Sequence, residues 1–444
     1  MIDANIRIIK QLKQLIFLVK ENESVRTLFF NGENSFKRNR SLPLERLISF
    51  ILNMPKKSLN IEIPEFFNAI NLEKLTCTKS AFSIQRQKLK YIFFAWLNAS
   101  YVNSFYSNYG NNVKRWRGFR LMAVDGSTAY LINKPEVVEH FGVQANHHTS
   151  VAMGQIMSIY DVLNEVVVSS VLLPIKTSEP EIANGWIQHI EDDMLVIYDR
   201  GFPSFISLYL HLHQEREKKF IMRCKIGFNN EVSQFVKSSK QQEIVEFRPT
   251  DHAISQLKRH GFKITSKERI KVRLIKVQLD KGIEPEILIT NLWDATEYPA
   301  RIFKELYFKR WGIETFYDKI KNKIQLESFS GYKVNSILQD FYATILIANL
   351  QTLITKQCEE KVDSLNKRRK FTYKVNANIS IGMMKNRIIH LFLTQNPEEI
   401  LAELGDLFLK YLEQIRPDRT YERTTKFKRL KGKYQTLTNY KRAA

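Results

Sequence analysis

The stretch "YFKRWGIETFYDKIKNKI", residues 307–324, contains four polar side chains spaced three, four and seven residues apart: Tyr307, Arg310, Glu314 and Lys321. At about 100° per residue, these side chains fall within about 60° of arc on an α-helix. The neighbouring stripe is apolar and aromatic and comprises Ile313, Phe316, Tyr317, Ile320 and Ile324. The pattern predicts a helix that buries one stripe and holds a single carboxylate among a phenol and two cations on the next.

One interpretation of the polar stripe is a surface ladder of ion pairs, because Arg310 and Glu314 form an ordinary i,i+4 pair. Such a ladder accounts for Glu314, but it does not account for the additional cations beside it. Two acids earlier in the chain favour a second interpretation.

These two acids stand in similar local settings. Asp125 follows the apolar run 121–124 and precedes Gly126, and Asp199 follows the apolar run 195–198. A carboxylate at the end of a buried strand can project into the open edge of an α/β sheet, where binding sites are common. Asp-Gly pairs also end strands as ordinary turn chemistry, so each acid taken alone leaves both interpretations open.

Together, Asp125, Asp199 and Glu314 indicate metal chemistry. Three carboxylates supply the hard oxygen ligands that Mg²⁺ prefers. Two such ions can activate the attacking oxygen and stabilise the leaving oxygen when a phosphodiester is cleaved. Arg310 and Lys321 could then neutralise DNA phosphates, and the phenol of Tyr307 could hydrogen-bond one.

The charge of the chain points to a polyanionic partner. Its 444 residues carry a formal net charge of +22, and the segment 416–444 alone has ten Lys and Arg against two acids. Nucleic acid explains this excess best, whereas a ribosome-associated or anionic-lipid-binding protein is the alternative. We expect the basic tail to be disordered when free.

The composition also argues against a membrane or secreted protein. We find no uninterrupted apolar run of about 18 residues and no signal peptide at the start, which predicts an amphipathic helix. The three cysteines, Cys77, Cys224 and Cys358, are far apart, so they indicate neither a disulfide framework nor a zinc knuckle. We therefore expect an intracellular, cytoplasmic protein that associates with the nucleoid when bound to DNA.

The motif Y-x2-R-x3-E-x6-K, preceded by "AVDGS", "YDRGFPS" and "LITNL", resembles the signature of bacterial DDE transposases of the insertion-sequence-four family. The resemblance covers about residues 115–335. It implies an RNase H-like fold in which Asp125, Asp199 and Glu314 bind two Mg²⁺ ions, with Mn²⁺ as a substitute. It also implies that Tyr307, Arg310 and Lys321 contact transposon-end DNA. Members of this family cut both strands at each end through a hairpin intermediate and transfer the 3′ ends to target DNA.

The order of elements agrees with that fold. Residues 118–224 predict a β-hairpin followed by βαβ units, which indicates a mixed sheet covered by helices. We therefore expect an α/β, RNase H-like mixed sheet with helices on both faces, interrupted by a β-rich insertion, plus helical N-terminal and C-terminal regions. The expected regions are a DNA-binding helical region (1–75), the catalytic domain (76–225 and 294–360), the insertion (226–293) and a C-terminal helical region with the basic tail (361–444).

Other residues have simpler interpretations. Trp293 could stack on a flipped base during hairpin formation, or it could be a core residue. The pair His147-His148 has no acid or cysteine at ligand spacing, so we expect a structural role. Asp161 is expected to start the hairpin turn, and Asp192 and Asp193 to flank the strand before Asp199.

The sequence thus predicts a transposase that acts on double-stranded DNA, both transposon ends and target, as a homodimer on DNA and without a membrane. Two alternatives remain open. One is another RNase H-like nuclease such as a junction resolvase, which would not need a long insertion before the final Glu. The other is an inactive DNA-binding relative, although such a relative would be expected to lose one of the three acids.

Overall fold

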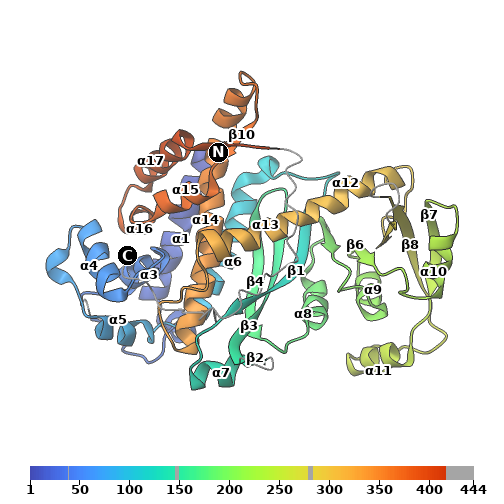
Figure 1. The fold of residues 1–444 in the computed structure, drawn as a ribbon. Coiled ribbons are helices and arrows are strands. Elements are labelled where there is room, and N and C mark those ends of the chain that lie inside the picture. The colour runs from blue at the N-terminus through green and yellow to red at the C-terminus, as the bar shows by residue number, and fades with distance from the viewer. Residues whose placement is uncertain (39, 146–149, 279–283, 417–444) are drawn as a thin grey trace, which may run out of the picture.

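The computed structural model describes residues 1–38, 40–145, 150–278 and 284–416, and its central element is one mixed sheet (Figure 1). Over these residues the strand order is β2-β3-β1-β5-β6-β9-β8-β7, with β4 also paired to β3. The strands are β1 (Arg120–Tyr130), β2 (Val143–Ala145), β3 (Ser150–Asp161), β4 (Val166–Pro174), β5 (Met194–Tyr198), β6 (Lys219–Cys224), β7 (Gln242–Phe247), β8 (Ile270–Val277) and β9 (Glu286–Thr290). His147, His148 and residues 417–444 lie outside the described residues, so the expectations for them stay predictions.

Strand β1 has neighbours of opposite direction on its two sides. On one side, β1 pairs antiparallel with β3 along its length, from Met122 opposite Asp161 to Tyr130 opposite Met153. On the other side, it pairs parallel with β5, and this pairing ends with Val124 opposite Tyr198. Strand β6 continues the parallel arrangement beside β5. This is the hairpin followed by βαβ units that the sequence predicts, and the predicted mixed α/β fold class is confirmed.

The segment 226–293 extends the same sheet. Strand β9 pairs antiparallel with β6, and β8 and β7 follow in order at that edge. The segment also contains two helices, α10 (Asn230–Lys237) and α11 (Asp251–Arg259). The β-rich stretch is therefore continuous in hydrogen bonding with the central strands.

Helices cover both faces of the sheet, as the alternation of side chains along β1 requires. Met122 and Val124 face a cluster that includes Ala183 and Leu208 on one side. Leu121 faces Leu306 on the other side. The helices between and after the strands are α7 (Pro135–Phe141), α8 (Glu179–Trp186), α9 (Phe205–Leu212), α12 (Phe303–Phe308) and α13 (Gly312–Asp318). In Figure 1, α12 and α13 run across one side of the sheet, while α8 and α9 lie on the other.

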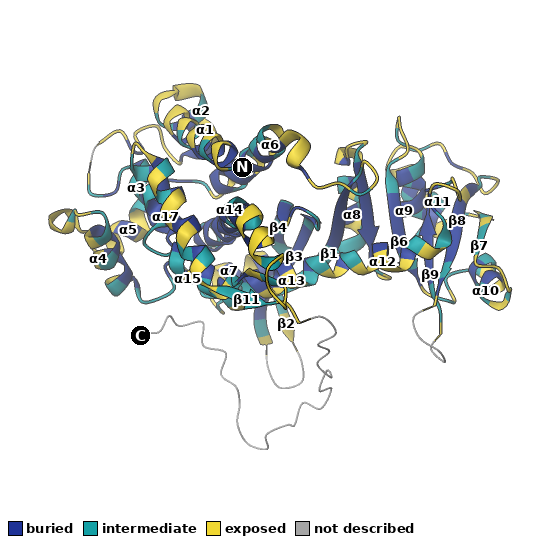
Figure 2. Ribbon diagram, turned by 90° about the horizontal axis from the view of Figure 1, so that it is seen from above, coloured by how far each residue is buried: buried dark blue, intermediate teal, exposed yellow. Residues whose placement is uncertain are grey.

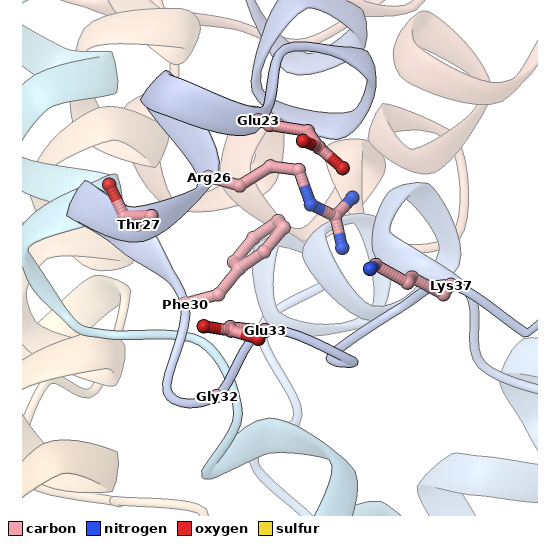
Figure 3. Close-up of a pocket in the computed structure, with 7 residues that line it drawn as sticks. All are labelled: Glu23, Arg26, Thr27, Phe30, Gly32, Glu33 and Lys37. Atoms are coloured by element: carbon pink, nitrogen blue, oxygen red, sulfur yellow. The ribbon is translucent and has the colours of Figure 1, made fainter.

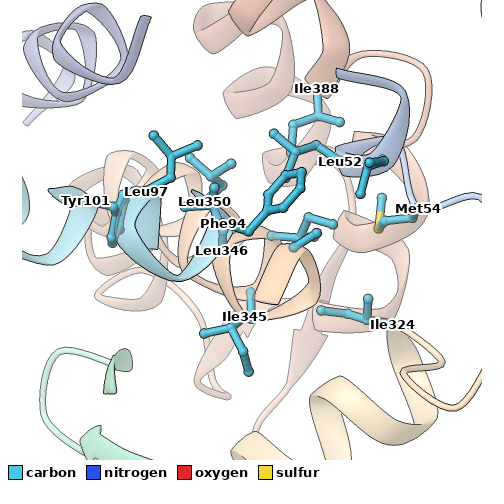
Figure 4. Close-up of a cluster of buried hydrophobic side chains, with 14 of the residues drawn as sticks. Leu52, Met54, Phe94, Leu97, Tyr101, Ile324, Ile345, Leu346, Leu350 and Ile388 are labelled. Atoms are coloured by element: carbon cyan, nitrogen blue, oxygen red, sulfur yellow. The ribbon is translucent and has the colours of Figure 1, made fainter. Parts of the chain in front are cut away.

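The first and last helices of the described chain pack together. They are α1 (Ile2–Glu21), α2 (Glu23–Phe29), α3 (Leu44–Leu52), α4 (Leu59–Ala69), α5 (Lys79–Arg86), α6 (Ile92–Tyr109), α14 (Val334–Asn366), α15 (Ala377–Met384), α16 (Ile388–Leu393) and α17 (Pro397–Lys410). Figure 4 shows Leu52, Phe94, Leu346 and Ile388, from four of these helices, in one buried cluster. A small two-stranded antiparallel sheet of β10 (Tyr373–Val375) and β11 (Leu412–Gln414) also belongs to this part.

The helix α14 is the centre of that core. By length and composition it could cross a membrane, but 94% of its most apolar 18-residue window is buried inside the protein. Figure 2 shows the surrounding helices carrying exposed residues on their outer faces. Burial on all sides explains why α14 is apolar around its circumference rather than along one stripe.

A buried ion pair connects α5 to α14. Arg86, which is 1% exposed, lies 2.9 Å from Asp340 and also donates to Gln339 and Ser330. The backbone N–H of Ser330 donates to the same carboxylate. Because every partner is hydrogen-bonded, this pair fixes the N-terminal helices to the helix that follows the predicted catalytic segment.

Candidate active site

Asp125 lies within a strand, which corrects the prediction that it ends one. Strand β1 continues to Tyr130 because β3 supplies antiparallel partners on one side beyond Asp125. The parallel neighbour β5 stops at Tyr198, however, so β1 has one paired side from Asp125 onward. The carboxylate therefore lies where the neighbouring strand ends, although its own strand does not.

Asp199 follows β5 directly, as predicted. Its backbone carbonyl accepts from the N–H of Phe202, which closes the turn that leads towards α9. Because β5 is parallel to β1, the carboxyl end of β5 comes beside the middle of β1. The sheet thus brings Asp125 and Asp199 to the same edge, although 73 residues lie between them in the sequence.

The helix predicted over 307–324 is interrupted twice. A 3-10 turn, Lys309–Trp311, joins α12 to α13, and a π-helical segment, Lys319–Lys323, follows α13. Within the π segment, the buried Lys319 donates to the backbone carbonyl of Ala348 and the hydroxyl of Thr352 on α14. The extra residue in a π turn changes the direction of the side chains that follow it, so the four signature residues do not form one straight stripe.

Three residues of this helical segment nevertheless meet the two strand acids. The Tyr307 hydroxyl donates to Asp199 at 3.0 Å. Arg310 Nη2 donates to Glu314 at 2.9 Å, and Arg310 Nη1 lies 3.6 Å from the Asp125 carboxylate. The i,i+4 pair of the surface-ladder interpretation is therefore formed, but its Arg310 is buried and also approaches a carboxylate from β1, while Glu314 stays partly exposed. Asp125, Asp199 and Glu314 come together around Arg310 and Tyr307.

The environment shifts the pKa values of Asp125 and Asp199 in opposite directions. Burial raises the pKa of Asp125 to about 6, against the opposing effects of the Gly126 N–H and Arg310, and the charges of Asp199 and Glu179 act in the same direction as burial. Burial would also raise the pKa of Asp199. There, the Arg200 N–H, Arg310 and the Tyr307 hydroxyl outweigh it, so the pKa of Asp199 lies below its ordinary value. Two carboxyls with separated pKa values in one place are typical of a functional site.

Arg310 is the cation of this cluster and has unused donors. It is 4% exposed, and its Nε and Nη1 are buried without a hydrogen-bond acceptor among the described residues. Burial lowers the pKa of Arg310, but Tyr307, Asp199 and Asp125 outweigh it and hold the guanidinium charged. Buried donors are rarely left unpaired in proteins, so these two nitrogens are available to a water molecule or a polar ligand.

Three further side chains at the site were missed at the sequence level. Tyr317 donates to the backbone carbonyl of Asp125 at 2.7 Å, although its spacing assigned it to the apolar stripe. Arg223 on β6 lies 3.9 Å from Asp199 and 2.8 Å from Glu286, and a strand residue between apolar neighbours gave no signal. Glu179 approaches Gly126 from α8, and its position in the first turn of a helix had an ordinary explanation.

Two predicted DNA contacts lie away from the carboxylates. Lys321 is about 10 Å of helix rise beyond Glu314. Burial lowers the pKa of Lys321, and the nearby charge acting on it is Glu327.

Trp293 follows the carboxyl end of β9, which is antiparallel to β6, whereas Asp199 follows the carboxyl end of β5, which is parallel to β6. Trp293 and Asp199 therefore lie at opposite ends of the strands. There its indole N–H donates to Glu217 at 3.1 Å. The position of Trp293 therefore does not support base stacking at the carboxylates of the same chain.

The remaining acids have the structural roles predicted for them. Asp161 accepts from the backbone N–H groups of Leu163 and Asn164 at the hairpin turn. Asp193 pairs with Arg120 ahead of β5, and Asp192 pairs with Lys218. These acids stabilise the turns that flank the site rather than facing it.

Among the described residues, no group of three or more His, Cys, Asp and Glu side chains is gathered closely enough to hold an ion as it stands. The hollow in Figure 3, of about 480 Å³, lies beside α2, where Arg26 is committed to backbone carbonyls of Lys20 and Ser35. This hollow is separate from the carboxylates, which lie where β5 ends beside β1.

A family model described as "Transposase DDE domain" matches residues 116–350, more than half of the chain. The chain belongs to this family. The matched part of this DDE transposase domain begins just before β1 and ends within α14, so it contains Asp125, Asp199 and Glu314 together with the segment 226–293.

Two transposases of Escherichia coli are similar in sequence to parts of this chain. The chain is 23% identical over 239 residues to "Transposase InsG for insertion sequence element IS4" of Escherichia coli (strain K12), a match that covers 53% of this chain and 52% of that protein. It is 24% identical over 103 residues to "Putative transposase InsZ" of the same organism, covering 22% and 34%. The chain spans about half or less of the length of these relatives. The resemblance to insertion-sequence-four transposases is confirmed.

Among solved structures, the piggyBac transposase synaptic complex with hairpin DNA shows a distant likeness. The sequence identity is 11% and the TM-score is 0.41, with 89% of this chain and 85% of that chain covered.

Proposed function

We propose that this protein is a transposase that binds the ends of an insertion sequence, cleaves DNA there, and joins the 3′ ends to target DNA. The observation that supports it is the meeting of Asp125, Asp199 and Glu314 around Arg310 and Tyr307, from three separate elements. Membership of the DDE transposase family makes DNA strand cleavage the reaction that this arrangement fits best.

The residues present fit divalent metal ions. Asp125, Asp199 and Glu314 offer only carboxylate oxygens, which Mg²⁺ prefers and Mn²⁺ also accepts. The Arg310 guanidinium lies among them and offsets part of their negative charge. Two bound Mg²⁺ ions would activate the attacking oxygen and stabilise the leaving oxygen of the phosphodiester.

The other side chains have positioning roles in this proposal. The Tyr307 hydroxyl and the Arg200 N–H orient Asp199. The Gly126 N–H orients Asp125 at 2.9 Å. Nε and Nη1 of Arg310, which have no hydrogen-bond acceptor among the described residues, suit phosphate oxygens of end DNA, since hydrogen bonds from a guanidinium to a phosphate are charge-assisted. Lys321, further along, would contact the backbone at a second phosphate.

The partners follow from the same proposal. A net charge of +22 suits double-stranded DNA at both the transposon ends and the target. Pairing of two ends requires a homodimer on DNA, in the cytoplasm at the nucleoid. Cleavage through a hairpin intermediate is the route that the family resemblance supports. A resolvase-like nuclease and an inactive relative are the alternatives, and the same assay distinguishes them.

The test separates cleavage from binding. We expect Asp125→Ala, Asp199→Ala and Glu314→Ala each to abolish Mg²⁺-dependent cleavage of DNA taken from the flanks of the coding region, because each removes a metal ligand. Binding of that DNA, measured by gel shift, should persist because the cations remain. The matched control is Asp318→Ala, an exposed acid on the helix of Glu314.

Near wild-type cleavage by any of the three variants would rule out this assignment. Cleavage that yields nicks at branched DNA but no joined ends would favour the resolvase. Wild-type protein that binds DNA and never cleaves it would favour the inactive relative.

A further inference from the structure

The first residue of α8, Glu179, comes unusually close to the backbone of β1. A Cβ atom added at Gly126 would lie 2.1 Å from Glu179 Oε1 and 2.4 Å from its carboxyl carbon. Real Cβ contacts do not occur at such distances, so a side chain at this position would displace the Glu179 carboxylate from where it lies. Gly126 lies in a regular strand and does not have a positive φ, so its lack of a side chain, and not its conformational freedom, is what the position requires.

A buried amide holds the Glu179 carboxylate in this place. Gln155 of β3 is 5% exposed, and its Nε2 donates to Glu179 Oε1 at 2.6 Å. The same Nε2 also approaches the backbone carbonyl of Ile156 at 3.3 Å. A carboxylate fixed by a buried donor has a defined position, unlike an ordinary acid in the first turn of a helix.

The two faces of the sheet meet at this point. Because side chains alternate along a strand, Asp125 faces the α13 side and Gly126 faces the α8 side. The pairing of β1 with β5 ends at Val124, one residue before Asp125. Beside Asp125 and Gly126, β5 is no longer present, so only β1 separates the face of the sheet covered by α8 from the face covered by α13. Consistent with this proximity, the charge of Glu179 acts with burial to raise the pKa of Asp125.

An independent observation indicates that a polar ligand belongs at this edge. Arg310 is only 4% exposed, and its Nε and Nη1 have no hydrogen-bond acceptor in the described chain. The Nη1 atom points towards Asp125 at 3.6 Å. Donors of this kind complete their hydrogen bonds with a bound oxygen group such as a phosphate whose charge is shared with a cation.

We propose that Glu179 is a fourth carboxylate of the cleavage site and holds a divalent ion together with Asp125, reaching it from the opposite face of the sheet. This inference rests on the proposed function. Gly126 makes room for the carboxylate and Gln155 positions it, so the "DG" of β1 serves the site through both residues.

The test measures Mn²⁺ binding to the full-length protein without DNA, by calorimetry, so that it does not depend on catalytic activity. Glu179→Gln keeps the shape of the side chain and removes the charge, and we expect it to weaken Mn²⁺ binding at least tenfold. The matched control is Glu181→Gln, an exposed acid in the same helical turn, which should bind Mn²⁺ as the wild type does. Wild-type affinity in Glu179→Gln would overturn the inference.

A parallel Asp125→Asn variant separates this inference from the proposed function. If Asp125→Asn loses Mn²⁺ affinity and Glu179→Gln does not, the fourth carboxylate is wrong and the proposed function stands. If neither variant changes the affinity, or the wild type binds no Mn²⁺, both are wrong.

Gly126→Ala offers a second route that is independent of the charge. The added Cβ should displace the Glu179 carboxylate, so we expect Gly126→Ala to lower Mn²⁺ affinity by itself and to cause no further loss in a Glu179→Ala background. Urea unfolding midpoints identify any variant that fails to fold. Additive losses in the double variant would contradict a role of Gly126 through Glu179.

Discussion

Arg310 lies four residues before Glu314 and touches carboxylates that come from different elements. At the sequence level, this residue had two interpretations, an internal ion pair and a DNA contact. The structure contains the ion pair, and Nε and Nη1, which have no hydrogen-bond acceptor among the described residues, leave capacity for the DNA contact. The two roles are compatible because a guanidinium has five donors in a fixed plane.

Salt dependence distinguishes an internal role from a phosphate contact. If Arg310 contacts a phosphate, Arg310→Ala should weaken binding to end DNA and lower the slope of log K against log salt by about one. Arg310→Lys should keep the slope and still bind more weakly, because an ammonium lacks the planar set of donors with which a guanidinium can bind Glu314 and a phosphate together. Gel shifts over a range of salt concentrations measure both effects. An unchanged slope in Arg310→Ala would confine this residue to the internal ion pair.

Single residues show where sequence reasoning succeeds and where it stops. Asp199 was placed correctly because an apolar run followed by an acid and a turn has a clear local signature. Asp125 was assigned to a strand end because its glycine resembled a turn, although Gly126 instead makes space for Glu179. That reason lies 53 residues away in the sequence, so no local pattern reveals it.

At the scale of elements, the interrupted helix 303–323 explains the limits of the spacing argument. Tyr307, Arg310 and Glu314 keep their common side because the 3-10 turn that joins α12 to α13 is short. Lys321 follows the start of the π segment, where contacts of Lys319 with α14 override the regular period. Helical periodicity identifies which residues share a face within one regular helix, but tertiary contacts decide where that helix is distorted.

Helix α9 carries a buried histidine beside the strand that presents Asp199. His211 is 0% exposed, and its ring nitrogens lie 3.1 Å from the Tyr198 hydroxyl and 3.1 Å from the Lys218 carbonyl. Burial lowers the pKa of His211 from 6.5 to about 3. The ring of Phe220 packs against the His211 ring, with 4.9 Å between the ring centroids. Among the described residues, no opposite charge contacts His211.

This histidine predicts a loss of stability in acid. The unfolded chain takes up a proton on His211 near pH 6.5, whereas the folded chain does so only near pH 3. The stabilisation is therefore complete above pH 6.5 and is lost as the pH falls towards 3, by about 1.4 kcal/mol per pH unit. Between pH 6.5 and 5, we expect the wild type to lose about 2 kcal/mol more than His211→Asn, by urea unfolding. Equal losses in the two proteins would show that His211 does not carry this dependence.

At the scale of the whole molecule, the sequence was sufficient to predict the mixed sheet, its hairpin and βαβ units, and the helical N-terminal and C-terminal regions. These features follow from apolar periodicity, which is a local property. The packing of the N-terminal and C-terminal helices around α14 was not predictable in this way. It depends on pairings such as Arg86 with Asp340, which are 254 residues apart and have no common local pattern.

We expect the basic tail, residues 417–444, to act in the assembly of two DNA ends. Removing residues 417–444 leaves all described elements intact and deletes nine Lys and Arg. We expect this deletion to weaken the pairing of two DNA ends more than the binding of one end, because the tail would lie on DNA or on the second subunit once both ends are present. Size measurements of both proteins, with and without end DNA, test this. Normal pairing of ends by the shortened protein would limit the tail to nonspecific binding.

The central claim is that acids from β1, β5 and α13 form one metal-binding cleavage site. The most direct measurement is anomalous X-ray scattering from crystals of the protein grown with Mn²⁺ and end DNA, since it locates the ions without relying on activity. The account predicts anomalous density bounded by Asp125, Asp199 and Glu314. Density only elsewhere in a complex with bound DNA, or none at the carboxylates at saturating Mn²⁺, would contradict it.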